Sequence, residues 1–170
     1  MGDSSAKVRV LALSDLECPF CKQFHNRIRD LQRSESDVAL IFVHYPLDRH
    51  RFARPAARAL ECSAGEGRFG EFLDRVFEFQ DSLGFKTFTA LAKDAGVRDT
   101  ARCNRCAADT KPVERIERGI ELGKQIGARG TPTVVINGWR FNRIPDDALL
   151  REASRRIQNG EPPPGAVPPK

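Results

Sequence analysis

The stretch "ECPFCKQF" (residues 17–24) places two cysteines at a C-x-x-C spacing, with a proline and a phenylalanine between them. Pro19 suits the first turn of a helix, because its missing N–H would have no partner there. Apolar side chains then recur at helical spacing, at Phe20, Phe24, Ile28 and Leu31. The sequence therefore predicts a helix that begins near Pro19, with Cys18 at its N-cap or just before it.

Apolar runs flank this helix on both sides. Residues 7–13, "KVRVLAL", end at Ser14-Asp15, and residues 38–45 read "VALIFVHY". Both runs are typical of buried strands. A strand, a helix and a second strand form a βαβ unit, in which we expect the two strands to be parallel.

The chain between residues 52 and 126 has the pattern of a helical block. The sequence predicts helices at 52–64, 68–80, 86–95, 99–108 and 111–126. The second of these carries an apolar stripe made of Phe69, Phe72, Leu73, Val76 and Phe77. We expect that stripe to pack in the core rather than to hold a cofactor.

The pattern returns to strands after Gly130. "TPTVVI" (131–136) and "WRFNR" (139–143) are separated by Asn137-Gly138, a strong hairpin signal. A final helix is expected at 146–157. The tail 158–170 is rich in proline, and we expect it to be disordered or extended.

Composition and charge exclude several classes of function. The 170 residues carry a net charge of +5, but acids are interspersed with the bases. The basic stretch "DRHRFARPAARA" (48–59) lacks the interleaved aromatic residues of a nucleic-acid stacking platform, so we expect a solvated helix face and no nucleic-acid partner. No apolar run approaches the ~20 residues that span a membrane. The first eight residues contain no apolar stretch, so we expect no signal peptide there.

Zinc is the first chemistry to weigh for the cysteines. A structural zinc site needs four ligands, and two C-x-x-C pairs, Cys18/Cys21 and Cys103/Cys106, would supply them. However, 81 residues lie between Cys21 and Cys103, far more than in a compact zinc ribbon. We therefore expect no metal site.

Redox chemistry fits the first pair better. The N–H groups and dipole at a helix N-terminus favour a thiolate at Cys18, and such sites lower a thiol pKa to roughly 3.5–7.5. Cys21 lies one turn further in and should be shielded. We therefore expect Cys18 to attack and Cys21 to resolve the mixed disulfide. A stabilised thiolate also favours the reduced form, so the disulfide becomes a stronger oxidant.

Three segments together resemble a known family: "SDLECPFC" (14–21), "HYPLDRHRFARPAARALEC" (44–62) and "ARGTPTVVINGWRF" (128–141). They resemble the DsbA-like thiol-disulfide oxidoreductases of the thioredoxin-fold superfamily, over about residues 8–157. The resemblance implies an α/β, thioredoxin-like fold with an inserted helical subdomain. The implied division is a split thioredoxin-like domain (1–50 and 110–157), a helical subdomain (51–109) and the tail (158–170). In this family a further strand usually precedes the first strand found here, so we expect a smaller sheet or a reordered edge.

The resemblance also implies a substrate site. It places a cis Thr131–Pro132 bond opposite the cysteine pair, where the proline offers no N–H and cannot bind metal. The backbone of Thr131 would then pair with an extended substrate segment. The implied rim consists of Pro19, Phe20, Thr131 and Pro132.

Other side chains near the pair allow more than one role. Asp15 and Glu17 are candidates for a proton relay to Cys21, or are helix-capping or solvated acids.

The remaining cysteines of this chain resemble those that form an additional disulfide in some relatives. We expect a structural disulfide between Cys62 and Cys103, with Cys62–Cys106 or three reduced thiols as the alternatives.

The expected function is thiol-disulfide exchange with protein substrates, as an oxidase served by a membrane or soluble redox partner, without a cofactor. A reductase or isomerase remains an alternative, although related isomerases carry a dimerisation domain for which the chain has no length, which favours a monomer. A redox-inactive binding module is a second alternative, and both cysteines argue against it. A copper-handling protein is a third, and the lack of an internal methionine argues against that. An extracytoplasmic location is favoured by the extra cysteines, and a cytoplasmic one stays open.

Overall fold

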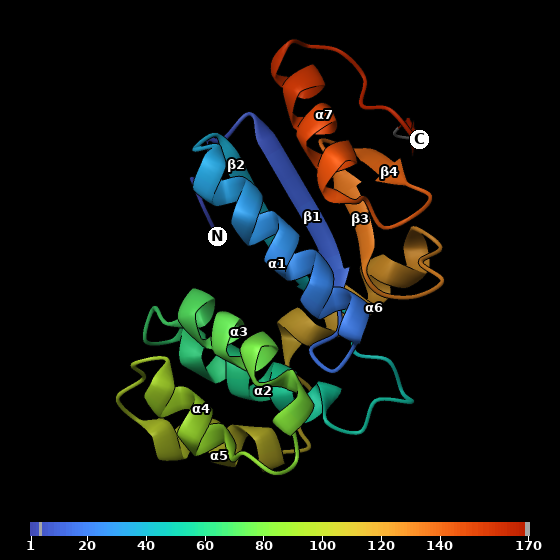
Figure 1. Ribbon diagram of the computed structural model, residues 1–170. Coiled ribbons are helices and arrows are strands. Elements are labelled where there is room, and N and C mark those ends of the chain that lie inside the picture. Colours follow the sequence, from blue (N-terminus) through green and yellow to red (C-terminus); the bar gives the residue numbers. More distant parts are fainter. Residues whose placement is uncertain (4, 169–170) are drawn as a thin grey trace.

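A five-stranded sheet organises one half of the molecule in this computed structural model, which describes residues 1–3 and 5–168 (Figure 1). The strands are β1 (Val8–Ser14), β2 (Val38–His44), β3 (Thr133–Ile136), β4 (Trp139–Phe141) and β5 (Ala166–Val167). Their order across the sheet is β2-β1-β3-β4-β5. β1 and β2 are parallel, as the βαβ pattern predicted, and the other neighbours are antiparallel.

Helices α1 (Pro19–Ser34) and α7 (Asp147–Gln158) pack together against this sheet (Figure 1). Their shared core contains alternate residues of the strands and the apolar stripes of the helices: Val8, Val10, Phe24, Ile28, Leu31, Val134, Ile136, Phe141 and Leu150. Helix α6 (Glu114–Gln125) packs on the end of β2. Gly119 permits that contact, because a Cβ there would lie 2.1 Å from the carbonyl oxygen of His44.

The second half of the molecule is a layer of short helices, shown in green and olive in Figure 1. These are α2 (Ala53–Ala64), α3 (Phe69–Glu78), α4 (Phe88–Asp94) and α5 (Thr100–Ala108), with a 3₁₀ turn at Gln80–Ser82. The aromatic stripe predicted for 68–80 does fill their core, where Phe72 and Phe77 are fully buried. Cys18 and Cys21 belong to this same core, so the cysteine pair lies where the two halves meet.

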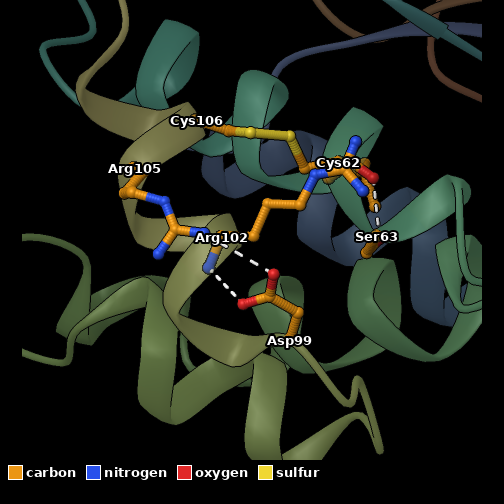
Figure 2. The surroundings of a disulfide bond; sticks show 7 residues. Cys62, Ser63, Asp99, Arg102, Arg105 and Cys106 are labelled. Atoms are coloured by element: carbon orange, nitrogen blue, oxygen red, sulfur yellow. Dashed lines mark hydrogen bonds and ion pairs between the residues drawn. A yellow bond between two sulfur atoms is a disulfide. The ribbon is translucent and has the colours of Figure 1, made fainter.

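The structural disulfide differs from the expected one. Cys62 bonds to Cys106 rather than to Cys103 (Figure 2). Cys103 is only 1% exposed and packs with the core of the helical layer as a free thiol. Cys106 lies one turn further along α5, half-buried on the side of that helix that packs against α2. Cys62 lies on α2. The bridge therefore ties α5 to α2, and the Cys62–Cys103 prediction was wrong.

Part of the proline-rich tail is extended, which is one of the two outcomes that the sequence predicted. After α7, Ala166–Val167 returns to the sheet as β5 and pairs with β4. β5 is therefore the edge strand beside β4, and it comes from the C-terminal end of the chain. Residues 169–170 of the predicted tail lie outside the described residues.

Candidate active site

The C-x-x-C motif forms the junction between β1 and α1. Cys18 is the N-cap residue of α1, with φ −80° and ψ 120°, and Pro19 is the first helical residue, as predicted. The carbonyl oxygen of Cys18 accepts from the backbone N–H groups of Cys21 (3.0 Å) and Lys22 (3.2 Å). Both cysteines are almost fully buried, whereas the neighbouring Phe20 is 58% exposed. The pair therefore lies just under the surface, with an apolar side chain beside it.

The Thr131–Pro132 segment lies against this junction from the other end of the chain. Its peptide bond is cis, as the resemblance implied. The thiol of Cys18 donates to the carbonyl oxygen of Thr131 over 3.4 Å. The structure thus brings together cysteine and proline motifs that are 113 residues apart in the sequence.

The pKa values of the two thiols shift in opposite directions. A hydrogen bond from the thiol of Cys21 is the main cause that lowers the pKa of Cys18 to about 5, and the Thr131 side chain and the N–H groups of Cys21 and Phe20 lower it further against the effect of burial. Burial is the main cause that raises the pKa of Cys21, and the neighbouring Cys18 sulfur raises it further. Only weaker contacts oppose this, including the backbone N–H of Asp15, 3.4 Å from the Cys21 sulfur. At neutral pH the pair therefore holds a thiolate at Cys18 and a thiol at Cys21.

The two carboxylates of the junction hold a neighbouring loop in place. Asp15 is 1% exposed and accepts from the backbone N–H groups of Glu17 and Leu47 and from Nδ1 of His50, at 2.7, 2.7 and 2.9 Å. The carboxylate of Glu17 accepts from the backbone N–H of Phe52 at 2.5 Å. Both acids therefore anchor the segment after β2 to the redox junction.

Sequence reasoning missed a third anchor, Gln80. Its buried side-chain amide donates to the carbonyl oxygens of Leu16 (2.8 Å) and Cys18 (3.1 Å). Gln80 follows an aromatic stripe in the helical layer, and no sequence pattern links it to residues more than 60 positions earlier. It gives the buried Leu16 carbonyl a partner and adds a contact to the Cys18 carbonyl, which already accepts from Cys21 and Lys22.

The geometry is suited to dithiol–disulfide exchange. One thiolate and one protonated thiol lie one helical turn apart, beside the backbone of Thr131. Within residues 1–3 and 5–168 no group of three or more metal-ligating side chains comes together, and no helix is long and apolar enough to cross a membrane.

Comparison with known proteins agrees with this geometry. A family model described as Thioredoxin matches residues 1–153. The chain belongs to this thioredoxin family. Among solved structures it is similar to oxidised BdbD from Bacillus subtilis, with a TM-score of 0.81 and 23% identity over 94% of this chain and 92% of that one. It is also similar to DsbA2 of Pseudomonas aeruginosa, with a TM-score of 0.69 and 28% identity over 89% of each chain. The resemblance to DsbA-like oxidoreductases and the thioredoxin-like fold are therefore confirmed.

The curated relatives are longer proteins. The chain is 32% identical over 142 residues to the Na⁺/H⁺ antiporter NhaA 3 of Salinispora tropica, a match that covers 83% of this chain and 22% of that protein. The NhaA 1 antiporter of Mycolicibacterium vanbaalenii is also 32% identical, over 91% of this chain and 26% of its own length. The chain thus spans about a quarter of the curated relatives it matches.

Proposed function

We propose that this chain is a thiol-disulfide oxidoreductase that oxidises protein thiols through the Cys18–Cys21 pair. The proposal rests on the opposite pKa shifts of the two sulfurs, because the pKa of Cys18 is lowered and that of Cys21 is raised. An attacking or leaving sulfur needs a stable thiolate, and a resolving sulfur is best kept protonated until it is needed.

The reaction starts from the Cys18–Cys21 disulfide. A substrate thiolate attacks the sulfur of Cys18, and the bond to Cys21 breaks. Cys21 leaves and takes up a proton. A second substrate thiolate then attacks the sulfur that is bound to Cys18, so the substrate gains a disulfide and Cys18 leaves as a thiolate. The substrate loses two electrons and the pair gains two, and a redox partner must later reoxidise the pair.

The protons of this cycle pass close to the junction. We propose that Asp15 or Glu17 relays the proton of Cys21, as the sequence suggested. The backbone N–H of Asp15 touches the Cys21 sulfur, and its carboxylate is linked to the partly exposed His50. From the Asp15 carboxylate the proton would pass to His50 and then to solvent.

The substrate site of this proposal is the backbone at Thr131, with a rim of Pro19, Phe20 and Pro132. Thr131 lies directly beside the reactive sulfur, and Phe20 offers exposed apolar surface to an incoming chain. An extended substrate would add to the backbone there as a short strand.

The oxidising direction is favoured by the low pKa of Cys18, because a stable thiolate drives the disulfide toward reduction. A reductase or isomerase would use the same pair with a reducing partner, and a binding module would need neither sulfur. The Cys62–Cys106 bridge favours an extracytoplasmic site of action, where such bonds persist.

Single-cysteine variants test the proposal. The assay is the recovery of disulfides in a reduced, unfolded protein. Cys18→Ser and Cys21→Ser should both abolish activity, because neither can form the disulfide that accepts the substrate's electrons. Cys103→Ser, which alters a thiol remote from the reaction, should retain activity. Normal oxidation by Cys18→Ser would overturn the proposal.

A further inference from the structure

A groove is lined in part by the Thr131–Pro132 segment, which lies beside the cysteine pair. Its volume is about 890 Å³, within the usual range for binding sites. One wall is the segment from the end of α6 to β3 (residues 125–132), and the other is β4 with its flanking residues (138–144). Val167 and Pro168, at the end of β5, also line the groove.

The charged side chains that line this groove are all positive. Arg129, Arg140 and Arg143 line it, and none of its lining residues is an aspartate or a glutamate. Arg140 is already used, because its guanidinium donates to the carbonyl oxygens of Ile126 and Gly127 and so ties the two walls together.

The other two arginines lack such partners. Arg129 and Arg143 are exposed, and neither side chain forms a hydrogen bond or ion pair with any residue in the described part of the chain. Most other arginines of this protein pair with a carboxylate, as Arg54 does with Glu117 and Arg118 does with Glu114. Two unpaired cations at the walls of one groove thus leave positive charge facing whatever enters it.

We propose that this groove selects substrates whose reactive cysteine lies in an extended, acidic segment, with Arg129 and Arg143 as the residues that set this specificity. The inference rests on the proposed function, since Thr131 both lines the groove and contacts the reactive sulfur of Cys18. Arg129 precedes Thr131 by two residues, a distance of about 7 Å in extended chain. A substrate carboxylate two or three residues from the cysteine would therefore reach Arg129, and one further along would reach Arg143.

The expected preference is moderate, because both arginines are exposed. Exposed ion pairs contribute about 0.2–1 kcal/mol each, which corresponds to roughly 1.4- to fivefold in rate for each arginine. Such contacts are screened by salt, so the preference should shrink as ionic strength rises from about 0.05 M to 0.5 M.

The test uses three dithiol peptides of one length, with glutamate, glutamine or lysine two and three residues from the first cysteine. The oxidised, full chain is mixed with each peptide at pH 7, and disulfide formation is followed by rapid acid quench and mass spectrometry. Each rate is divided by the rate of the same peptide with hydroxyethyl disulfide, a neutral oxidant, which removes the effect of the peptide charge on its own thiol. The variants are Arg129→Gln with Arg143→Gln, and the matched control is Arg98→Gln, which removes one charge from a 90% exposed arginine outside the groove.

The proposal predicts normalised rates in the order glutamate, glutamine, lysine for the wild type and the Arg98→Gln control. In the double variant the ratio of the glutamate rate to the glutamine rate should fall to about 1. Equal rates for all three peptides in the wild type would overturn the inference and leave the proposed function intact. A preference that survives in the double variant would overturn the assignment to these arginines. If no peptide is oxidised at all, the proposed function itself fails.

Discussion

The acidity of Cys18 depends first on the thiol of Cys21, and this dependence can be tested by a matched pair of variants. Cys21→Ala removes the hydrogen bond that lowers the pKa of Cys18 to about 5. Cys21→Ser keeps an O–H donor at the same position. A hydrogen bond to a charged group contributes about 1.5–3 kcal/mol, and one pKa unit corresponds to about 1.36 kcal/mol. We therefore expect a pKa for Cys18 of roughly 6–7 in the alanine variant and one close to 5 in the serine variant.

The assay is the absorbance of the thiolate at 240 nm between pH 3 and 9. The titration midpoint is a better measure than an alkylation rate, because a thiolate of higher pKa is also a stronger nucleophile. Cys103 does not interfere, since burial raises its pKa. Equal midpoints near 5 in both variants would refute the reasoning, because the pKa would then come from the helix N-terminus and Thr131 alone.

Three further predictions concern stability. Gly119→Ala would place a Cβ against the β2 backbone and should cost about 1–3 kcal/mol of unfolding free energy in denaturant titrations, whereas Gly70→Ala, whose Cβ meets only a flexible side chain at 3.4 Å, should be near neutral; similar midpoints for both would contradict this packing. Cys62→Ser opens the bridge to Cys106, which closes a 44-residue separation, and should cost up to about 4 kcal/mol, so an unchanged midpoint would contradict the pairing. As pH rises from about 5 toward 8.5, the thermal midpoint of the reduced wild type should rise relative to that of the oxidised form. In this range the folded protein has already lost the Cys18 proton, whereas the unfolded chain still holds it. A difference between the two midpoints that does not change with pH would argue against the lowered pKa.

Much of the redox junction could be predicted from local sequence. Pro19 marked the start of α1 and placed Cys18 at its N-cap, and the apolar runs gave parallel β1 and β2. These features depend on short-range rules, namely the missing N–H of proline and the periodicity of apolar residues. Thr131 and Pro132 were placed by resemblance, since no local rule predicts contact across 113 residues.

The features that were missed depend on tertiary geometry. Cys103 and Cys106 lie one turn apart on α5, and only the packing of that helix decides which one turns toward α2. Gln80, the first residue of the 3₁₀ turn after α3, donates to the junction because of where that turn packs, which no local sequence pattern predicts. The strand β5 has two residues, too few for an alternating pattern, and forms because β4 offers a free edge.

The equilibrium redox potential of the Cys18–Cys21 pair, measured against glutathione, tests the central claim most directly. A potential near about −120 mV is the expected result, because a stabilised Cys18 thiolate makes the disulfide a strong oxidant. A potential near about −270 mV, typical of a reductant, would contradict the account.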